Sequence, residues 1–134
     1  MSKNSLRIFL VDDEPSVLFA LKLLLQAFGH QVSDFKSSAR ALEYLRSDKG
    51  HSFDVILCDL RMPEHDGFEV LREVKEIAPS LPFLLMSGHA TSEEIHHATH
   101  LGAAGFLAKP FQPEEIKEMF VKVTSPQKEV RNSA

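Results

Sequence analysis

The sequence alternates five times between a short segment, mostly apolar except for QVSDF at 31–35, and a longer stretch whose apolar residues recur at helical spacing. Short apolar runs suit strands, whereas apolar residues that recur three and four positions apart suit the buried side of a helix. Strands that alternate with helices pair in parallel, because each helix crosses back over the sheet. We therefore predict an α/β fold with a doubly wound five-stranded parallel sheet covered by helices on both faces. The predicted strands are 6–11, 31–35, 54–59, 82–87 and 104–108.

The run DVILCD at 54–59 is typical of a strand that is covered on both faces. Its apolar residues 55–58 show no solvent-facing alternation, as expected when helices pack on each side of a parallel sheet. The run nevertheless ends in Asp59. A buried strand that delivers a carboxylate to its own end points to a functional site there.

Local signals predict where several helices begin and end. Pro15 suits the first turn of a helix, where its missing N–H costs nothing, and Gly29 is a natural stop for that helix. Asp66 and Glu69 are spaced as in a capping box, in which each side chain accepts from the other residue's backbone N–H. A later helix is expected to open at Thr91.

Length and composition restrict the class of protein. A chain of 134 residues has the size of one domain and can bury a core. Its formal net charge of -4 argues against direct nucleic-acid binding. No apolar run approaches the roughly 20 residues that span a bilayer, and residues 1–5 lack a signal-peptide pattern, so we expect no membrane contact and a cytoplasmic location. Cys58 is the single cysteine, which excludes an internal disulfide, and we expect an inert core residue.

Five polar side chains stand at the ends of four predicted strands. Asp12 and Asp13 follow the first strand and Asp59 ends the third. Ser87 ends the fourth strand and Lys109 follows the fifth. In open α/β sheets, ligands bind beyond the carboxyl ends of the strands, at the point where the strand order reverses. We therefore expect these five residues to lie along one rim of the sheet.

The carboxylates of Asp12, Asp13 and Asp59 would repel one another unless a positive charge lies among them. Carboxylates held together raise one another's pKa unless a cation shares the site. Oxygen ligands favour a hard ion, and a site that keeps several water molecules suits Mg²⁺ better than Ca²⁺, with Mn²⁺ as a plausible substitute. The simpler interpretation, that Asp12 and Asp13 only cap the first helix, does not explain the residues at the other strand ends.

Four segments in a fixed order resemble the receiver domain of two-component response regulators: VDDEP, CDLRMP, MSGHA and AKPF. The resemblance runs from about Leu6 to Val123. It implies a chemotaxis-regulator-like fold, which is a flavodoxin-like three-layer sandwich with strand order 2-1-3-4-5. It also implies a receiver domain at 6–124, after an N-terminal tail at 1–5 and before a polar C-terminal tail or linker stub at 125–134.

By this resemblance, Asp59 is the phosphoacceptor of a phosphorelay. Its carboxylate would take the phosphoryl group from a phosphohistidine of a sensor histidine kinase or a histidine phosphotransfer protein. Asp13, Asp59 and the backbone carbonyl of Arg61 would bind Mg²⁺ directly, and Asp12 would act through a metal-bound water. Such a domain catalyses only its own phosphorylation and dephosphorylation, so it would be a signalling domain and not an enzyme.

The resemblance also implies roles near the fourth and fifth strands. Lys109 would pair with the acceptor carboxylate and then with phosphoryl oxygens, one of which Ser87 would bind. Phe106 stands at the position of the family's switch aromatic, and the alternative is an ordinary core phenylalanine. Pro110 matches a position whose preceding peptide bond is cis, a geometry that proline makes accessible. The output partner would meet the face formed by the fourth helix, the fifth strand and the fifth helix.

Two residues beside the site stand where the family varies. Arg61 lies two positions after the acceptor, and His89 lies two positions after Ser87. We hypothesise that both set the lifetime of the phosphorylated state. The alternative is that both are plain surface residues.

Histidines recur on the predicted fourth helix. His96 and His100 are four positions apart, and His97 and His100 are three apart, which is a spacing that can bind a transition metal. No acidic third ligand is clearly placed with them. A solvated face that a partner can contact is therefore the favoured interpretation.

Two other classes of function stay open from the sequence. An aspartate-nucleophile phosphohydrolase of the haloacid dehalogenase type also uses a strand-end aspartate with Mg²⁺. That family needs a second acid two positions after its nucleophile, where this chain has Arg61 after Asp59 and Pro15 after Asp13. A non-phosphorylated pseudo-receiver scaffold is the other alternative, and it is weakened because every phosphorylation residue is present.

Overall fold

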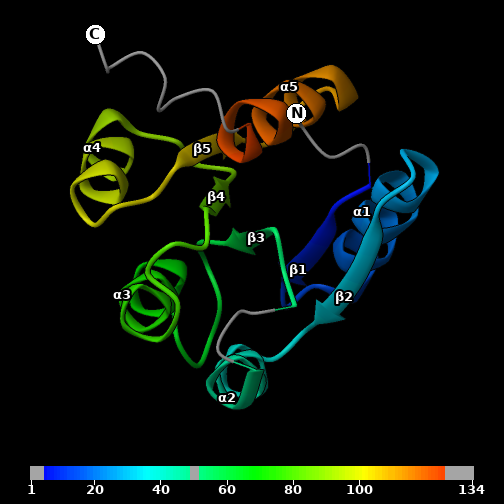
Figure 1. Cartoon of the computed structure of the whole chain (residues 1–134). Coiled ribbons are helices and arrows are strands. Elements are labelled where there is room, and N and C mark those ends of the chain that lie inside the picture. The colour runs from blue at the N-terminus through cyan, green and yellow to red at the C-terminus, as the bar shows by residue number, and fades with distance from the viewer. Residues whose placement is uncertain (1–4, 49–51, 126–134) are drawn as a thin grey trace, which may run out of the picture.

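The computed structural model describes residues 5–48 and 52–125, and it places a parallel sheet between two layers of helices (Figure 1). The strand order is β2-β1-β3-β4-β5, and each neighbouring pair is parallel. The predicted fold class and strand order are therefore confirmed. In chain order the elements are β1 Arg7–Val11, α1 Pro15–Ala27, β2 Gln31–Phe35, α2 Ser38–Asp48, β3 Val55–Asp59, α3 Gly67–Ile77, β4 Phe83–Ser87, α4 Ser92–His100, β5 Gly105–Ala108 and α5 Pro113–Thr124.

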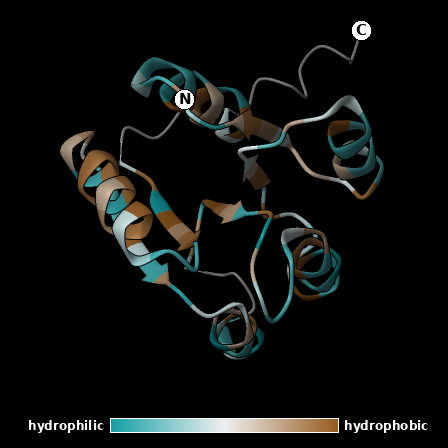
Figure 2. Ribbon diagram, turned by 180° about the vertical axis from the view of Figure 1, so that it is seen from behind, coloured by the Kyte–Doolittle hydropathy of each residue, from teal (hydrophilic) through white to brown (hydrophobic). Residues whose placement is uncertain are grey.

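The central strands serve two apolar cores at once. Alternate residues of β3 point to opposite faces, so Ile56 and Cys58 pack in the cluster under α2, α3 and α4. Val55 and Leu57 pack in the cluster under α1 and α5. All residues of β3 and β4 are buried, which explains why neither strand alternates in sequence. Figure 2 shows hydrophobic colour on β3, β4 and β5 and hydrophilic colour on the edge strand β2, while the helices carry both colours.

The predicted helix signals hold in the structure. Pro15 is the first residue of α1, and Gly29 follows that helix with a φ of 94°, a conformation that glycine adopts without a Cβ penalty. The Asp66–Glu69 capping box is present, with backbone-to-carboxylate distances of 3.0 and 2.9 Å. Thr91 caps α4 by accepting from the Glu94 N–H at 3.1 Å.

Four strands begin one residue later than predicted, and only β2 matches its predicted bounds among the described residues. At β3 the reason is Asp54, whose carboxylate accepts from the Arg7 N–H at 2.8 Å beside the sheet. At β4 the reason is Pro82, which has no N–H to donate to a neighbouring strand. The helix predicted around 39–45 extends over Ser38–Asp48.

Most of both predicted tails lies outside the described residues, namely 1–4 of the N-terminal tail and 126–134 of the C-terminal one. The division into a domain at 6–124 with two tails therefore stays a prediction. None of the helices in the described part of the chain combines the length and apolar character needed to cross a bilayer.

Candidate functional site

The ends of four neighbouring strands bring the predicted site residues to one rim. Asp12 follows β1, Asp59 is the last residue of β3, Ser87 is the last residue of β4, and Lys109 follows β5. Asp12 and Ser87 are fully buried, and Asp59 is 6% exposed. Because β1, β3, β4 and β5 are adjacent and parallel, residues distant in sequence meet at this edge. The predicted convergence is therefore present.

Asp12, Asp13 and Asp59 form an acidic cluster. Each offers a carboxylate oxygen, and these three atoms lie within 4.8 Å of one another. Burial raises the pKa of Asp12, and the charge of Asp59 adds to this, while the Glu14 N–H and Lys109 oppose it. The Glu14 N–H donates to Asp12 Oδ1 at 3.0 Å. An all-oxygen set with this much negative charge has the chemistry of a hard divalent cation site.

Lys109, which follows β5, hydrogen-bonds to the carboxylates of Asp12 and Asp59. Its Nζ lies 2.7 Å from Asp59 Oδ1 and 3.4 Å from Asp12 Oδ2. Burial alone would lower the pKa of Lys109, but the hydrogen bond to Asp59 and the charges of Asp12 and Asp59 outweigh it and raise that pKa. Lys109 is therefore a fixed cation beside Asp59. The peptide bond between Lys109 and Pro110 is cis, as predicted.

Ser87 presents a buried hydroxyl at the end of β4. Its Oγ accepts from the backbone N–H of His89 at 3.0 Å. A hydroxyl that accepts in this way keeps its own hydrogen to donate. The side chain of His89 itself is exposed. His89 therefore contributes to the site through its backbone in this structure.

Arg61 lies in the loop after β3 and reaches α4. Its Nη2 forms an ion pair with Glu94 Oε2, and the Arg61 side chain is 61% exposed while that of Glu94 is 15% exposed. Sequence reasoning missed this partner, because the two residues are 33 positions apart and Glu94 carries a local helix-start signal that accounts for it. No signal in the sequence pairs them.

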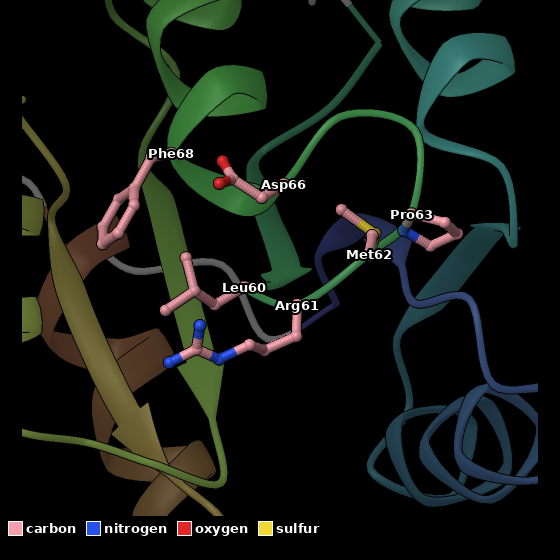
Figure 3. A pocket seen from close by; sticks show the side chains of 6 residues that line it. All are labelled: Leu60, Arg61, Met62, Pro63, Asp66 and Phe68. Atoms are coloured by element: carbon pink, nitrogen blue, oxygen red, sulfur yellow. The ribbon is translucent and has the colours of Figure 1, made fainter.

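The loop between β3 and α3 is also tied to the start of α2. Glu64 Oε1 accepts from Ser37 Oγ at 3.1 Å, and the His65 N–H donates to Ser38 Oγ at 3.1 Å. Gly67 then brings α3 against the strand end, since a Cβ there would lie 2.8 Å from the carbonyl oxygen of Asp59. This loop borders a hollow of about 360 Å³ whose lining is shown in Figure 3: Leu60, Arg61, Met62, Pro63, Asp66 and Phe68.

Phe106 and the histidines of α4 form no second metal site among the described residues. Phe106 is half-buried and packs against the cluster under α2, α3 and α4. His97 packs edge-on against Phe68 at a ring-centroid distance of 4.6 Å, while His96 and His100 are exposed. Across residues 5–48 and 52–125, the one group of three metal-ligand side chains is the acidic cluster, so these histidines form no such group.

Cys58 is a core residue, as expected. It is fully buried in β3, and burial together with the nearby charges of Asp59, Asp12 and Asp66 raises the pKa of its thiol well above the usual value. Its Sγ donates weakly to the Asp59 carbonyl oxygen at 3.3 Å. A protonated, enclosed thiol is a poor nucleophile, so its position next to Asp59 gives it no reactivity.

A parallel sheet of this order with a lysine-paired acidic rim is the arrangement that the resemblance to receiver domains implied, and comparison with known proteins assigns the same family. The family described as "Response regulator receiver domain" matches residues 8–121. The chain belongs to this family. Receiver domains are signalling domains and not classical enzymes, and they partner with histidine kinases and output domains, so the phosphohydrolase interpretation is set aside.

Individual relatives support the same assignment. The chain is 34% identical over 122 residues to the transcriptional regulatory protein ZraR of Escherichia coli strain K12, a match that covers 91% of this chain and 27% of ZraR. A receiver domain protein from Clostridium thermocellum superposes with a TM-score of 0.85 at 28% identity, covering 92% of this chain and 98% of that one. The chain thus spans about a quarter of the length of ZraR and nearly all of a solved receiver domain.

One solved relative bears on the acidic cluster. The receiver domain of a sensor histidine kinase from Pseudomonas aeruginosa PAO1 superposes with a TM-score of 0.78 at 25% identity, covering 90% of this chain and 98% of that one. That protein is described with a magnesium ion coordinated in its active-site cleft.

Proposed function

We propose that Asp59 accepts a phosphoryl group from a phosphohistidine of a sensor histidine kinase or a histidine phosphotransfer protein. A carboxylate oxygen of Asp59 forms the new P–O bond as the P–N bond to the donor histidine breaks. The observation that carries this proposal is the Lys109 ammonium 2.7 Å from Asp59 Oδ1, beside two further carboxylates. A carboxylate placed this way is oriented for attack, and the cation next to it stabilises the charge that builds during transfer.

The acidic cluster is the proposed Mg²⁺ site. Asp13, Asp59 and the backbone carbonyl of Arg61 would hold the ion directly, and Asp12 would act through a water. When bound, the ion would neutralise negative charge on the transferring phosphoryl group. The all-oxygen donor set fits this ion, and the magnesium described in the Pseudomonas aeruginosa receiver domain supports it. Mn²⁺ is expected to substitute.

Ser87 and Lys109 are proposed to form hydrogen bonds with oxygens of the phosphoryl group. That group brings a charge of about -1.5 to -2 and strong hydrogen-bond acceptors. Two charge-assisted hydrogen bonds are worth about 3 to 6 kcal/mol together, whereas inverting a 1:99 conformational equilibrium takes about 5.5 kcal/mol. Lys109 already binds Asp59 in this structure, so part of its contribution is present before phosphorylation. The two contacts therefore reach the required free energy only near the top of their range, with little to spare.

Phe106 is proposed to turn inward when the Ser87 hydroxyl moves toward the phosphoryl group. The side chain is half-buried and already packs against the core cluster under α2, α3 and α4. It carries no hydroxyl, so it can form no phenolic hydrogen bond in the new position. Its contribution to the switch is then the burial of apolar surface alone.

We assign the partners to two faces beside the rim. The phosphodonor is placed at the side of α1 that borders a mostly apolar hollow of about 480 Å³, which is lined by Val17, Leu21, Gly88, Lys109, Pro110 and Phe111. This hollow reaches Lys109, whose Nζ binds Asp59. The output partner is placed on α4, β5 and α5, where Ile95 and Val121 are 41% and 59% exposed.

Incubation with acetyl phosphate and Mg²⁺ tests the proposal. Intact-mass spectrometry should show one phosphoryl group per chain, with loss of the signal on removal of Mg²⁺ or in Asp59→Asn. Asp34→Asn is the matched control, because Asp34 pairs with Lys22 at 3.3 Å and lies outside the acidic cluster. Phosphorylation that persists in Asp59→Asn would refute the assignment of the acceptor.

The same assay separates the remaining alternatives. Absence of any reaction with acetyl phosphate, and with a panel of phosphohistidine donors, would support a pseudo-receiver scaffold.

The hypothesis that Arg61 and His89 set the lifetime of the phosphorylated state needs a second measurement. If Arg61→Ala and His89→Ala leave the rate of dephosphorylation unchanged, both are surface residues without that role.

A further inference from the structure

The ion pair between Arg61 and Glu94 joins two segments that matter for the proposed signalling. Arg61 lies two residues after Asp59, and Glu94 lies in the first turn of α4. Figure 3 shows the Arg61 side chain extending past Leu60 on the side where Phe68 lies, away from Pro63. The acceptor loop is thereby connected to a helix of the proposed output face.

Few contacts attach α4 to the rest of the domain, so this ion pair makes up a large part of its attachment. Of its nine residues, Ala98 is the one that is buried. The ring of His97 packs edge-on against Phe68 of α3. Glu94 is mostly covered, and its Oε1 is buried without a hydrogen-bond partner in the described part of the chain. Its Oε2 therefore depends on Arg61 for a counter-charge.

A phosphoryl group on Asp59 would attract the same guanidinium. Two residues of chain span at most about 7 Å, so Arg61 begins close to the acceptor. Arginine forms bidentate bonds with phosphate as readily as with carboxylate, and a phosphoryl group carries the larger charge. Glu94 and the phosphoryl group are thus competing anions for one cation.

We propose that Glu94 is a positioning residue that holds Arg61 on α4 in the unphosphorylated state, and that a phosphoryl group on Asp59 competes with Glu94 for the Arg61 guanidinium. This inference rests on Asp59 being the phosphoacceptor. Phosphorylation then loosens the α4 attachment, and by reciprocity the Arg61–Glu94 pair weakens the binding of a phosphoryl group by the same factor. The pair thus adds to the coupling between phosphorylation and α4 that Ser87 and Lys109 provide.

The closing experiment compares two isosteric variants of neighbouring residues. Glu94→Gln removes the competing charge, and Glu93→Gln removes the same charge from the same first turn, where Glu93 is exposed and no ion pair of it is seen in the described residues. The ligand is beryllofluoride with Mg²⁺, measured by calorimetry, with wild type as reference. We expect Glu94→Gln to bind about two- to fivefold tighter than Glu93→Gln, the range for pairs of this exposure.

Two further measurements separate competition from a change in helix stability. In an Arg61→Ala background the Glu94→Gln substitution should lose its effect on beryllofluoride affinity, since the cation that both anions share is gone. Without ligand, amide hydrogen exchange across α4 should be faster in Glu94→Gln than in Glu93→Gln. Equal affinities for the two variants, or a Glu94→Gln effect that survives Arg61→Ala, would overturn the coupling.

The wild-type protein distinguishes failure of this inference from failure of the proposed function. If wild type binds beryllofluoride and the two variants do not differ, the phosphoacceptor assignment stands and the coupling is wrong. If wild type neither binds beryllofluoride nor reacts with acetyl phosphate, the proposed function fails and the coupling falls with it. In that case the exchange measurement still decides whether the pair holds α4.

Discussion

Helices α3 and α4 follow neighbouring strands, yet the domain holds them very differently. α3 buries Gly67, Val70, Leu71 and Val74 and starts with a two-way capping box. α4 buries Ala98 alone among its nine residues. Helix α3, which follows the loop after Asp59, is therefore fixed, and α4, which belongs to the proposed output face, is lightly attached. Elements that move in a switch come from the least stable parts of a fold, so this difference suits a domain that changes one face while keeping its chemistry in place.

The largest effect should come from the rim that both helices border. Lys109→Met removes the cation 2.7 Å from Asp59 and leaves the carboxylates of the fixed side without a positive partner. We expect phosphorylation by acetyl phosphate to slow by about 10² to 10³-fold, the usual cost of losing one charge-stabilising donor. Rates are followed by intact mass, with Lys117→Met on α5 as the control. A rate equal to that of the control would show that the ammonium has no part in the transfer.

Truncation of one aliphatic side chain on each helix sharpens the comparison directly. Leu71→Ala empties space in the core under α3, where Leu71 is fully buried, and should lower the free energy of unfolding by about 2 to 5 kcal/mol. Ile95→Ala on α4 should change it by no more than about 0.5 kcal/mol, because Ile95 is 41% exposed. Urea denaturation gives both values. Similar losses in the two variants would remove the basis of the comparison.

The anchoring of α3 at Gly67 can be tested by adding one methyl group. A Cβ at Gly67 would lie 2.6 Å from Leu85 Cδ2 and 2.8 Å from the Asp59 carbonyl oxygen, so Gly67→Ala should cost about 1 to 3 kcal/mol of unfolding free energy. A Cβ at Gly88, before α4, would meet nothing within 4 Å, which makes Gly88→Ala the matched control. A Gly67→Ala protein as stable as this control would mean that α3 shifts freely.

The smallest effect is expected from pH, at a residue remote from both helices. His30 Nδ1 accepts from the Leu6 N–H at 3.0 Å, and burial lowers the pKa of His30 below its usual 6.5. The unfolded chain then binds the proton more readily, so this stabilisation is present above about pH 6.5 and is lost as pH falls through the folded pKa. Urea midpoints between pH 8 and pH 5 should fall less in His30→Gln than in wild type.

The exposed histidine His100 supplies the control for that measurement. His100→Gln also removes one histidine, but its side chain is exposed and the Leu6–His30 hydrogen bond stays intact. If His30→Gln and wild type lose stability in parallel on acidification, the Leu6–His30 hydrogen bond is not responsible.

Local patterns predicted most of the fold. The short segments that alternate with helical stretches located every strand to within a residue. Cap chemistry predicted the Asp66–Glu69 box because both partners lie within one helical turn. The rim of the site followed from one topological rule, since parallel strands place their carboxyl ends together. Asp12, Asp59 and Lys109 could thus be grouped although they are far apart in sequence.

Contacts between loops and helices could not be predicted in this way. The Arg61–Glu94 pair spans 33 positions and the Ser37–Glu64 hydrogen bond spans 27, and each of these residues is an ordinary surface type in its own segment. Such pairings depend on how the layers pack and carry no periodicity of their own. The same holds for His97 on Phe68, which separates one histidine of the α4 group from the other two.

The single buried residue of α4 has a consequence for how such domains diversify. Surface substitutions away from special contacts usually change stability by less than about 0.5 kcal/mol. Most positions of α4 can therefore change with little penalty to folding, while the acidic rim and its lysine remain constrained by their mutual charges. A duplicated copy of this gene could acquire a new partner through α4 and retain the same acidic rim with its proposed chemistry.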